Sequence, residues 1–288
     1  MFSCYLFGID RQVYYRKVRR KISKQSKAEQ VVSMVIEIRK SMPRLGTRKL
    51  YYLLLEKLQS ISIGRDKFFD ILRANHLLIQ PKRSYHITTN SHHRFRKHQN
   101  QILDLEINRP EQVWVSDITY IGKRDKPCYL SIVTDAYSKK IMGHYVSDNL
   151  NTESSLIALK AAVKQRKNKH LSLIHHSDRG LQYCANDYQR MLNKNHIFCS
   201  MTQNSDPYEN AVAERINGIL KQEFMIDKYN QDLDIMKRIV KEAISTYNEE
   251  RPHYSNYMLT PDQMHVQNQI QMRTYKTKNS SKLLLTTV

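Results

Sequence analysis

A succession of short apolar runs in the second half of the chain limits its possible folds more than any other feature. Runs rich in β-branched and aromatic residues cover residues 113–120, 129–135 and 141–146. Beyond them, helical periodicity alternates with two further apolar runs, at 171–174 and 197–200. Three consecutive strands followed by alternating helices and strands are typical of a mixed sheet with packed helices. We therefore predict an α/β domain built on a five-stranded sheet.

A smaller, all-helical region is predicted upstream of this sheet. Residues 8–15 indicate a turn and a short helix, followed by a basic stretch that ends at Lys27. Helical spacing of apolar residues then predicts a helix over 28–40, a second one that Thr47 caps, and a third over 64–75. Three short helices with basic starts fit a helix-turn-helix DNA reader, with an ordinary basic helical bundle as the alternative.

The charge of the chain is strongly positive and unevenly distributed. Lys and Arg number 47 against 27 Asp and Glu, which gives a formal net charge of +20. Residues 1–110 carry most of this excess, with 23 basic and 8 acidic residues. Such an excess points to a polyanionic partner, and nucleic acid is the leading candidate. A membrane is the weaker alternative, since no apolar run approaches the roughly 18 to 20 residues needed to span one.

The cysteines and histidines do not form a recognisable metal or disulfide pattern. The four cysteines are scattered without a close pair, which favours a reduced protein of the cytoplasm or the bacterial nucleoid. Four histidines cluster near residue 90, but no cysteines stand at ligand spacing beside them, so we reject a zinc site. These histidines are His86, His92, His93 and His98.

Three acidic residues are candidates for a catalytic or metal-binding role because of where they lie on the predicted strands and helices. Asp117 lies inside the first predicted strand, where a charge is costly to bury unless it is paired or binds a cation. Asp178 follows the apolar run 171–174, and sites in open α/β sheets gather at the carboxyl ends of strands. The simpler alternative for Asp178 is a residue that caps the next turn.

Glu214 lies on a predicted helix over residues 209–226. A projection at about 100° per residue places Glu214, Asn210, Asn217 and Lys221 on one face, opposite an apolar face. Taken alone, that polar face favours simple exposure to solvent. Its combination with two strand-borne aspartates in a basic protein is what two-metal phosphoryl transfer requires, because Mg²⁺ prefers oxygen ligands.

Several motifs resemble the integrase-like transposases of bacterial insertion sequences, in particular the protein that the second reading frame encodes. The motifs are WVSDITY at 114–120, HSDRGLQY at 176–183, DPYENAVAER at 206–215 and YNEERPH at 247–253. Asp178 and Glu214 enclose 35 residues, as in that family, and Lys221 occupies its basic position seven residues after the glutamate. The segments 44–50 and 63–78 are similar to the family's helix-turn-helix region.

The resemblance implies a fold, a metal site and a reaction. The fold would be an RNase H-like mixed five-stranded sheet with flanking helices, preceded by a small all-α helix-turn-helix domain. Asp117, Asp178 and Glu214 would hold two Mg²⁺ or Mn²⁺ ions and catalyse cleavage and strand transfer of element ends. We expect contacts with DNA from Lys221, Asn210, Arg215, Arg44, Arg48, Lys49, Arg65 and Lys67.

Five segments are expected along the chain. They are a basic segment at 1–27, a helix-turn-helix domain at 28–80, a basic linker at 81–108, an integrase-like core at 109–265, and a frayed tail at 266–288. Relatives of this type often act as a longer fusion with an upstream-frame product, and this chain begins at Met1 without that region. It is then either the shorter product or the catalytic part of a larger one, and it acts as a homo-oligomer on element and target DNA.

Two other functions remain open from the residues alone. A nuclease of the same fold would cut DNA without joining it. A non-catalytic regulator would occupy the element ends through the basic N-terminal region and would not need the three acids.

Overall fold

The computed structural model describes residues 8, 10–80, 98–102, 105–122, 127–203 and 210–273. The chain divides into two compact units, residues 1–84 and 85–288. Most of the segment expected as a linker, with His86, His92 and His93, lies outside the described residues, as does the tail from residue 274. Among the described residues, no helix is long and apolar enough to cross a membrane.

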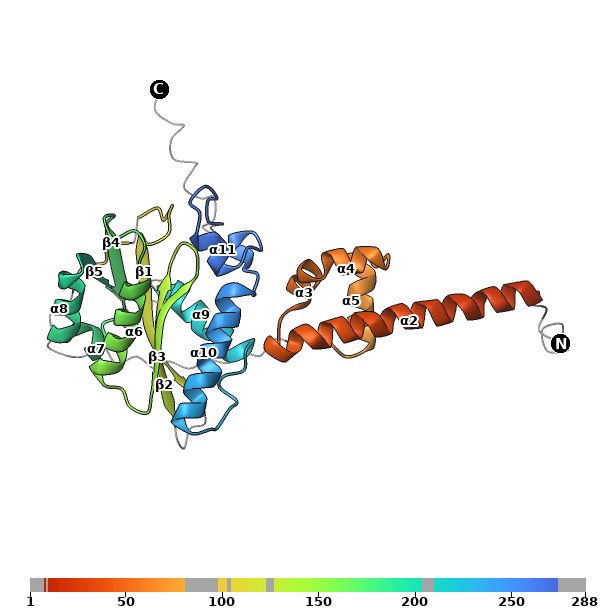
Figure 1. Ribbon diagram of the computed structural model, residues 1–288, viewed down its shortest axis with the longest axis horizontal. Helices are drawn as coiled ribbons and strands as arrows, with labels where there is room; N and C mark the ends of the chain where they lie inside the picture. The colour runs from red at the N-terminus through yellow and green to blue at the C-terminus, as the bar shows by residue number, and fades with distance from the viewer. Residues whose placement is uncertain are drawn as a thin grey trace, which may run out of the picture. The chain divides into compact units, whose positions relative to one another are not determined.

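In its described residues, 8 and 10–80, the first unit has one long helix and three short ones (Figure 1). The long helix α2 spans Arg11–Ser41, and α3, α4 and α5 span Thr47–Leu53, Leu55–Ser60 and Arg65–Ala74. Val31 and Val35 of α2 are fully buried, together with apolar residues of the short helices. The core of this unit therefore covers only the C-terminal half of α2. These core residues include Leu45, Leu50, Leu58, Phe68 and Leu72.

Helix boundaries in this unit differ from those expected. The predicted short helix, basic stretch and helix over 28–40 form one continuous helix, so the expected boundary at residue 27 lies inside α2. Asp10 caps this helix by accepting hydrogen bonds from the backbone of Gln12 and Val13, and no Gly or Pro interrupts it. Gly46, rather than Thr47, is the N-cap of α3.

The second unit is built on the predicted mixed sheet. Its strands are β1 Val113–Ile121, β2 Cys128–Asp135, β3 Ile141–Ser147, β4 Leu173–Ser177 and β5 Ile197–Met201. Their order is β3-β2-β1-β4-β5, with the first three antiparallel and with β4 and β5 parallel to β1. This is the RNase H-like arrangement that was expected. Strand β4 starts and ends later than predicted, so it leads directly into Asp178.

Helices cover both faces of the sheet (Figure 1). Trp114 belongs to a core with α6 Thr152–Gln165, α7 Leu181–Cys184 and α8 Asn186–Lys194. Val113 and Val115 face the other side, where α9 Ala211–Gln222 packs. The remaining helices are α10 Leu233–Glu249, which packs on β3, the short η2 Tyr254–Asn256, and α11 Pro261–His265. Alternation along β1 therefore sends its odd-numbered residues, Asp117 among them, toward α9.

Segments on both sides of the expected core also pack against it. Gln101 donates its backbone N–H to Ser200 of β5, and Ile102 packs near Val113. At the other end, the guanidinium of Arg273 lies over the rings of Tyr254 and Tyr257, at 4.7 and 4.5 Å from their centroids. The described parts of the expected linker and tail are therefore ordered pieces of the second unit.

A buried polar cluster fastens α11 to the start of the sheet. Asp135 accepts hydrogen bonds from the backbone of Glu111 and Ser138, at 2.7 Å each. The ring of His265 meets the Ser138 hydroxyl at 2.9 Å and lies within 4 Å of both carboxylates. Burial lowers the pKa of His265, but its hydrogen bonds to Asp135 and Glu111 outweigh that effect, so the net shift is upward. The cluster therefore favours a charged imidazole.

The close packing of α6 on β3 generates a prediction about stability. A Cβ atom at Gly143 would lie 2.1 Å from the carbonyl oxygen of Ala158 and 2.7 Å from the backbone nitrogen of Ala162. We expect Gly143→Ala to lower the free energy of unfolding by about 3 kcal/mol or more, because helix and strand must separate. Urea titration followed by the fluorescence of Trp114, the sole tryptophan, reports on this unit alone.

Gly218 of α9 provides the matched control. No described heavy atom outside its own helix lies within 4 Å of a Cβ placed there. Gly218→Ala should leave stability unchanged or raise it by up to about 1 kcal/mol, because alanine favours helices. Equal effects of the two substitutions would contradict the packing argument.

Candidate active site at the ends of β1 and β4

The two aspartates lie side by side because of how β1 pairs with β4. The parallel pairing of these strands ends with Ser116 opposite Ser177. Asp117 and Asp178 are the next residues on the two strands, and adjacent strands are only about 4.8 Å apart. The sheet thus presents two carboxylates together at the point where β1 and β4 separate.

Asp117 is held by two hydrogen bonds. The backbone N–H of Ile118 donates to its Oδ1 at 2.9 Å, and Nδ2 of Asn217 on α9 donates to its Oδ2 at 2.7 Å. Both bonds favour the ionised carboxylate. They orient Asp117 between the sheet and α9.

The electrostatic environment of Asp117 opposes these hydrogen bonds. Burial is the largest effect, and repulsion from Asp178 is the next, with a smaller contribution from Glu214. Together they raise the pKa of Asp117 from its ordinary 3.8 to about 7. The negative charges of two other carboxylates, Asp178 after β4 and Glu214 on α9, therefore act on Asp117.

Asp178 begins the turn that leads into α7. Its Oδ1 accepts a hydrogen bond from the backbone N–H of Gly180 at 3.0 Å, so the capping role considered from the sequence is real. Gly180 has an ordinary φ of −61°, and its special value lies in space, because a Cβ there would meet Asp178 Oδ1 at 3.0 Å. The glycine lets the backbone approach the carboxylate.

Part of the polar face of helix α9 is buried against β1. Asn210 and Asn217 are buried, although the sequence alone favoured a solvent-exposed face for them. Asn210 Nδ2 donates to the carbonyl of Ser116 at 3.1 Å, next to the bond from Asn217 to Asp117. The face that carries Glu214 is therefore turned toward the ends of β1 and β4.

Glu214 and Lys221 lie farther out on the same helix. Glu214 is exposed, and partial burial still raises its pKa. Lys221 is half-buried, and burial lowers its pKa, while the nearby Asp117 acts in the opposite direction. Arg215 is exposed and contributes to the electrostatic environment of Tyr247 instead. The structure thus brings Lys221 and Asn210 to the site, but it directs Arg215 elsewhere.

The other expected DNA contacts belong to the first unit. Arg48, Arg65 and Lys67 are exposed in the first turns of α3 and α5, and Arg65 pairs with Asp66 at 3.0 Å. Arg44 and Lys49 are partly buried, and Arg44 donates to the carbonyl of Gln80 at 2.7 Å.

Residues near the aspartates in sequence have structural roles. Trp114 is fully buried in the core under α6, so it packs rather than stacks on a base. His176 is buried, and its Nδ1 meets the Ser200 hydroxyl at 2.9 Å. Tyr183 is buried in the same core as Trp114, and Ser177 donates to the carbonyl of Asp178.

Asn217 is the site residue that the sequence interpretation missed. It was placed on the polar face of the helix, three residues after Glu214, but was not named as part of the site. Its hydrogen bond to Asp117 spans 100 residues of sequence, which no local pattern indicates. Its Oδ1 is buried and has no hydrogen-bond partner among the described residues.

The carboxylates of the site have the right chemistry for a divalent cation, but they are not arranged as a complete set of ligands. Within the described ranges, no three His, Cys, Asp or Glu side chains lie close enough to hold one ion. Asp117 nevertheless carries the repulsion of two other carboxylates, which a cation would relieve. Carboxylate oxygens are also the ligands that Mg²⁺ prefers. The residues fit such an ion, although Glu214 stands apart from the two aspartates.

Comparisons with known proteins identify the second unit. Residues 107–207 and 195–261 match two models of an integrase core domain. The chain is 30% identical over 254 residues to an uncharacterized 31 kDa protein of insertion element IS600 from Shigella sonnei, which covers 87% of this chain and 92% of that protein. It is 32% identical over 166 residues to the transposase InsF of insertion sequence IS3fB from Escherichia coli K12.

The InsF alignment covers 57% of each of the two proteins. Among solved structures, the chain is similar to the catalytic core domain of HTLV-2 integrase in complex with magnesium, at 20% identity and a TM-score of 0.43. That alignment covers 55% of this chain and 97% of the integrase core.

The crowding of carboxylates generates a prediction for the metal-free protein. Carbon-13 NMR of labelled aspartate side chains should show Asp117 titrating near pH 7. Asp178→Asn should lower the pKa of Asp117 because it removes a repelling charge. Asn217→Ala should raise it because the carboxylate loses a donor.

Asp187→Asn is the matched control, since Asp187 is exposed on α8 and pairs with Arg190. It removes the same charge as Asp178→Asn but should leave the pKa of Asp117 unchanged. Equal shifts from Asp178→Asn and Asp187→Asn would mean that the two aspartates at the strand ends do not interact.

Proposed function

The chain belongs to the integrase core domain family and is an insertion-sequence transposase, and we propose that it cuts its element's ends and joins them to target DNA through Asp117, Asp178 and Glu214. The observation that carries this proposal is that the carboxylates of Asp178, after β4, and Glu214, on α9, both act on Asp117 of β1. A strained group of carboxylates in a protein of net charge +20 is what a metal-dependent enzyme acting on a polyanion needs.

The three acids would hold two Mg²⁺ or Mn²⁺ ions. When bound, such ions activate an attacking oxygen, from water for cleavage or from a DNA 3′-hydroxyl for joining, and stabilise the departing oxygen. The reaction forms one phosphorus–oxygen bond and breaks another, so no covalent protein nucleophile is needed. Asp117 must lose its proton to serve as a ligand.

The residues around the acids have separate tasks in this proposal. Asn217 keeps Asp117 oriented through its hydrogen bond, and Asn210 fastens the start of α9 to β1. Lys221 places a positive charge beside Asp117, where it would meet a phosphate next to the cut. Glu214 lies on the same face of α9 and would complete the site through its own side chain, since Asn210 and Asn217 already hold this helix against β1.

The first unit would bind the element ends. Its short helices would act as the helix-turn-helix reader, with exposed cations in the first turns of α3 and α5 toward DNA. These cations are Arg48, Arg65 and Lys67, with Arg44 and Lys49 beside them. Cutting and joining two ends requires more than one active site, so the active form would be an oligomer on DNA.

Glu214→Gln tests the catalytic proposal. The substitution keeps the shape of the side chain and removes one negative charge, so we expect cleavage and joining to fall about 1,000-fold or more. The measurement uses Mg²⁺ and labelled duplexes that carry the element ends, with the chain alone and joined to its upstream-frame product. Binding of the same duplexes should change little.

Glu242→Gln is the matched control, since Glu242 is exposed on α10 and has the same charge. It should leave activity unchanged. Cleavage by the wild-type chain without any joined product, in both forms, would indicate a nuclease. Full transposition in cells by Glu214→Gln would indicate that the three acids are not the catalytic site.

The salt dependence of DNA binding tests the role of the first unit. Replacing Arg48 and Lys67 by Glu should weaken binding and reduce the slope of log K against log salt by about 1 for each phosphate that the protein no longer neutralises. Lys164→Glu, on the exposed surface of α6, is the control and should have a smaller effect. Equal weakening by the two changes would place the DNA on the core instead.

A further inference from the structure

Helix α2 continues well beyond the core of its own unit. Lys27, whose ammonium donates to the carbonyl of Ile61 at 2.8 Å, is its first residue with a hydrogen bond to the short helices. From Arg11 to Ser26, all residues are exposed except Val13 and Val18, which are partly buried. An isolated helix segment of this length is only marginally stable in water, so it needs a partner along its side.

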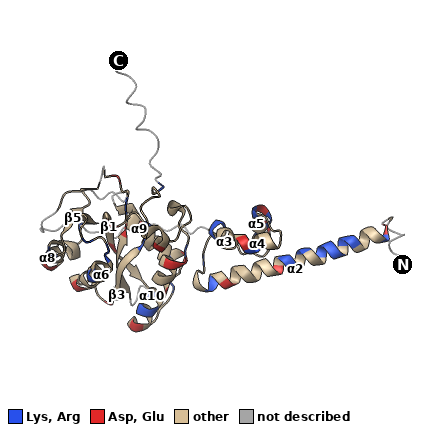
Figure 2. Cartoon of the chain, turned by 45° about the horizontal axis from the view of Figure 1, so that its top comes forward, with Lys and Arg blue, Asp and Glu red and all other residues tan. Residues whose placement is uncertain are grey.

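The basic side chains of this segment gather mainly on one side. Residues 11–27 contain eight Lys and Arg and no acidic residue, as Figure 2 shows by the blue bands along α2. Lys17, Arg20, Lys24 and Lys27 form a row with steps of three and four residues. The row continues into Val31, which is buried against the unit's core. The basic side of α2 is therefore the side on which α3, α4 and α5 pack.

A second row runs along the opposite side of the helix. It contains Tyr15, Val18, Ile22, Gln25, Glu29, Val32 and Ile36, and its steps alternate between three and four residues throughout. This is the heptad spacing of a helix that pairs with another helix. We call these seven residues the α2 seam.

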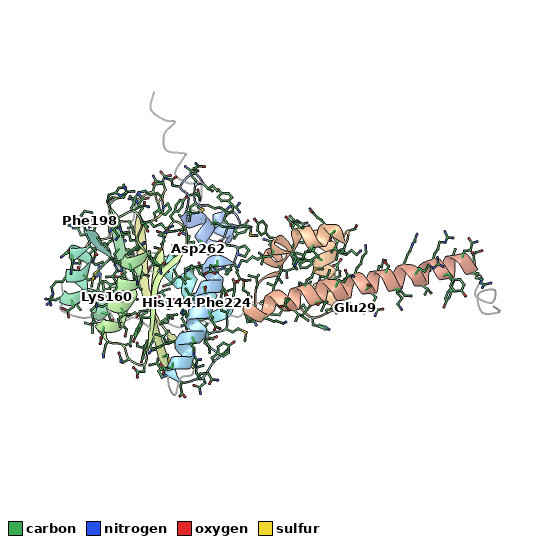
Figure 3. The ribbon with its side chains drawn as sticks, viewed as in Figure 1. Glu29, His144, Lys160, Phe198, Phe224 and Asp262 are labelled. Carbon is green, nitrogen blue, oxygen red and sulfur yellow. The ribbon has the colours of Figure 1, made fainter. Side chains whose placement is uncertain are left out.

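The seam is unusually exposed for its apolar content. Tyr15 is 49% exposed, Ile22 63% and Ile36 49%. Figure 3 marks the position of Glu29, one of the seam residues, along α2. Beside Glu29 the surface has a groove that Ala28, Val32, Ser33 and Ile36 of α2 line together with Asn75 at the end of α5.

We propose that the α2 seam pairs with the α2 seam of a second copy of this chain, in antiparallel orientation and centred near Lys27. In this register Val18 meets Ile36 of the partner subunit, and Ile22 meets Val32 of the partner subunit. Gln25 meets Glu29 of the partner subunit, a pairing of donor and acceptor. The small residues Ser26 and Ala28 lie at the crossing, where two helices must approach closely.

Charge selects the antiparallel orientation. A parallel pair would oppose the two Glu29 carboxylates and align both basic halves, each with eight positive and no negative side chains. In the antiparallel pair, each basic half lies beside residues 28–41, where Glu29 and Glu37 balance Arg39 and Lys40. The interface would then leave the basic rows free, on the side of each helix opposite the seam.

Site-directed cross-linking of the full chain tests this orientation. The background replaces Cys4 and the partly buried Cys199 by Ser and keeps the buried Cys128 and Cys184. Ser26→Cys should form a disulfide-linked dimer with itself, because residue 26 flanks the crossing, whereas Ser23→Cys, off the seam, should not. Val18→Cys should not cross-link with itself but should do so when mixed with Ile36→Cys.

Self-association gives the second readout. Sedimentation of nuclease-treated protein in about 0.5 M salt, where contacts through residual DNA are weak, measures the dimer directly. Ile22→Glu should raise the dissociation constant about 100-fold or more, because it buries an unpaired carboxylate in the seam. Ser23→Glu adds the same charge to the neighbouring, exposed position and should have little effect.

Several results would overturn the proposal. They are a wild-type chain that stays monomeric, a dimer that Ile22→Glu and Ser23→Glu weaken equally, and self-cross-linking by Val18→Cys. If Ile22→Glu weakened DNA binding but left self-association unchanged, the α2 seam would be a contact surface for nucleic acid instead. None of these measurements involves catalysis, so they remain valid whether or not the three acids form the active site.

Discussion

The parallel pairing of β1 with β4 is the constraint on which the site depends. It ends with Ser116 opposite Ser177, so the next residue on each strand is an aspartate. Backbone hydrogen bonds of the sheet hold the strands together and so keep two like charges close that would otherwise move apart. The cost appears in Asp117, whose pKa rises to about 7. A folded carboxylate with a raised pKa binds more protons than the unfolded one, so stability falls as pH rises from about 4 to about 7.

Helix α9 offsets this repulsion through the side-chain amides of two asparagines. Asn217 and Asn210 reach β1 from the same face that carries Glu214 and Lys221, and each donates one hydrogen bond to it. An amide supports an ionised carboxylate without adding charge of its own, which a second acid or a lysine could not do. The helix can therefore pack closely on the sheet and still present the side chains of Glu214 and Lys221 farther from it. The polar face of α9 thus has a buried part, with Asn210 and Asn217, and a part nearer the solvent, with Glu214 and Lys221.

The two units differ in the sign of the charge that they concentrate. The first unit carries most of the excess positive charge, and the second places the half-buried carboxylates of Asp117 and Asp178 together at one end of its sheet. A negative site could not remain attractive to DNA without basic surfaces in the same chain. Within the first unit, the row of cations from Lys17 to Lys27 and the α2 seam lie on opposite sides of α2, whereas Arg11 lies over the ring of Tyr15. The described segments 98–102, 105–107 and 266–273 pack on the core, so the second unit extends beyond its sheet and helices.

Local periodicity determined the five strands, most helices and the fold class, because residues that alternate or recur every three to four positions must bury one face. The positions of Asp117 in β1 and of Asp178 after β4 were predictable for the same reason, since strands can be located from apolar runs. The continuity of α2 was missed because a basic stretch looks like a break, although no residue in it prevents a helix. Only the tertiary structure decided that Asn217 meets Asp117 and that Trp114 packs under α6. Those contacts join residues far apart in sequence, and the sheet register that brings them together is set by the whole core rather than by any local pattern.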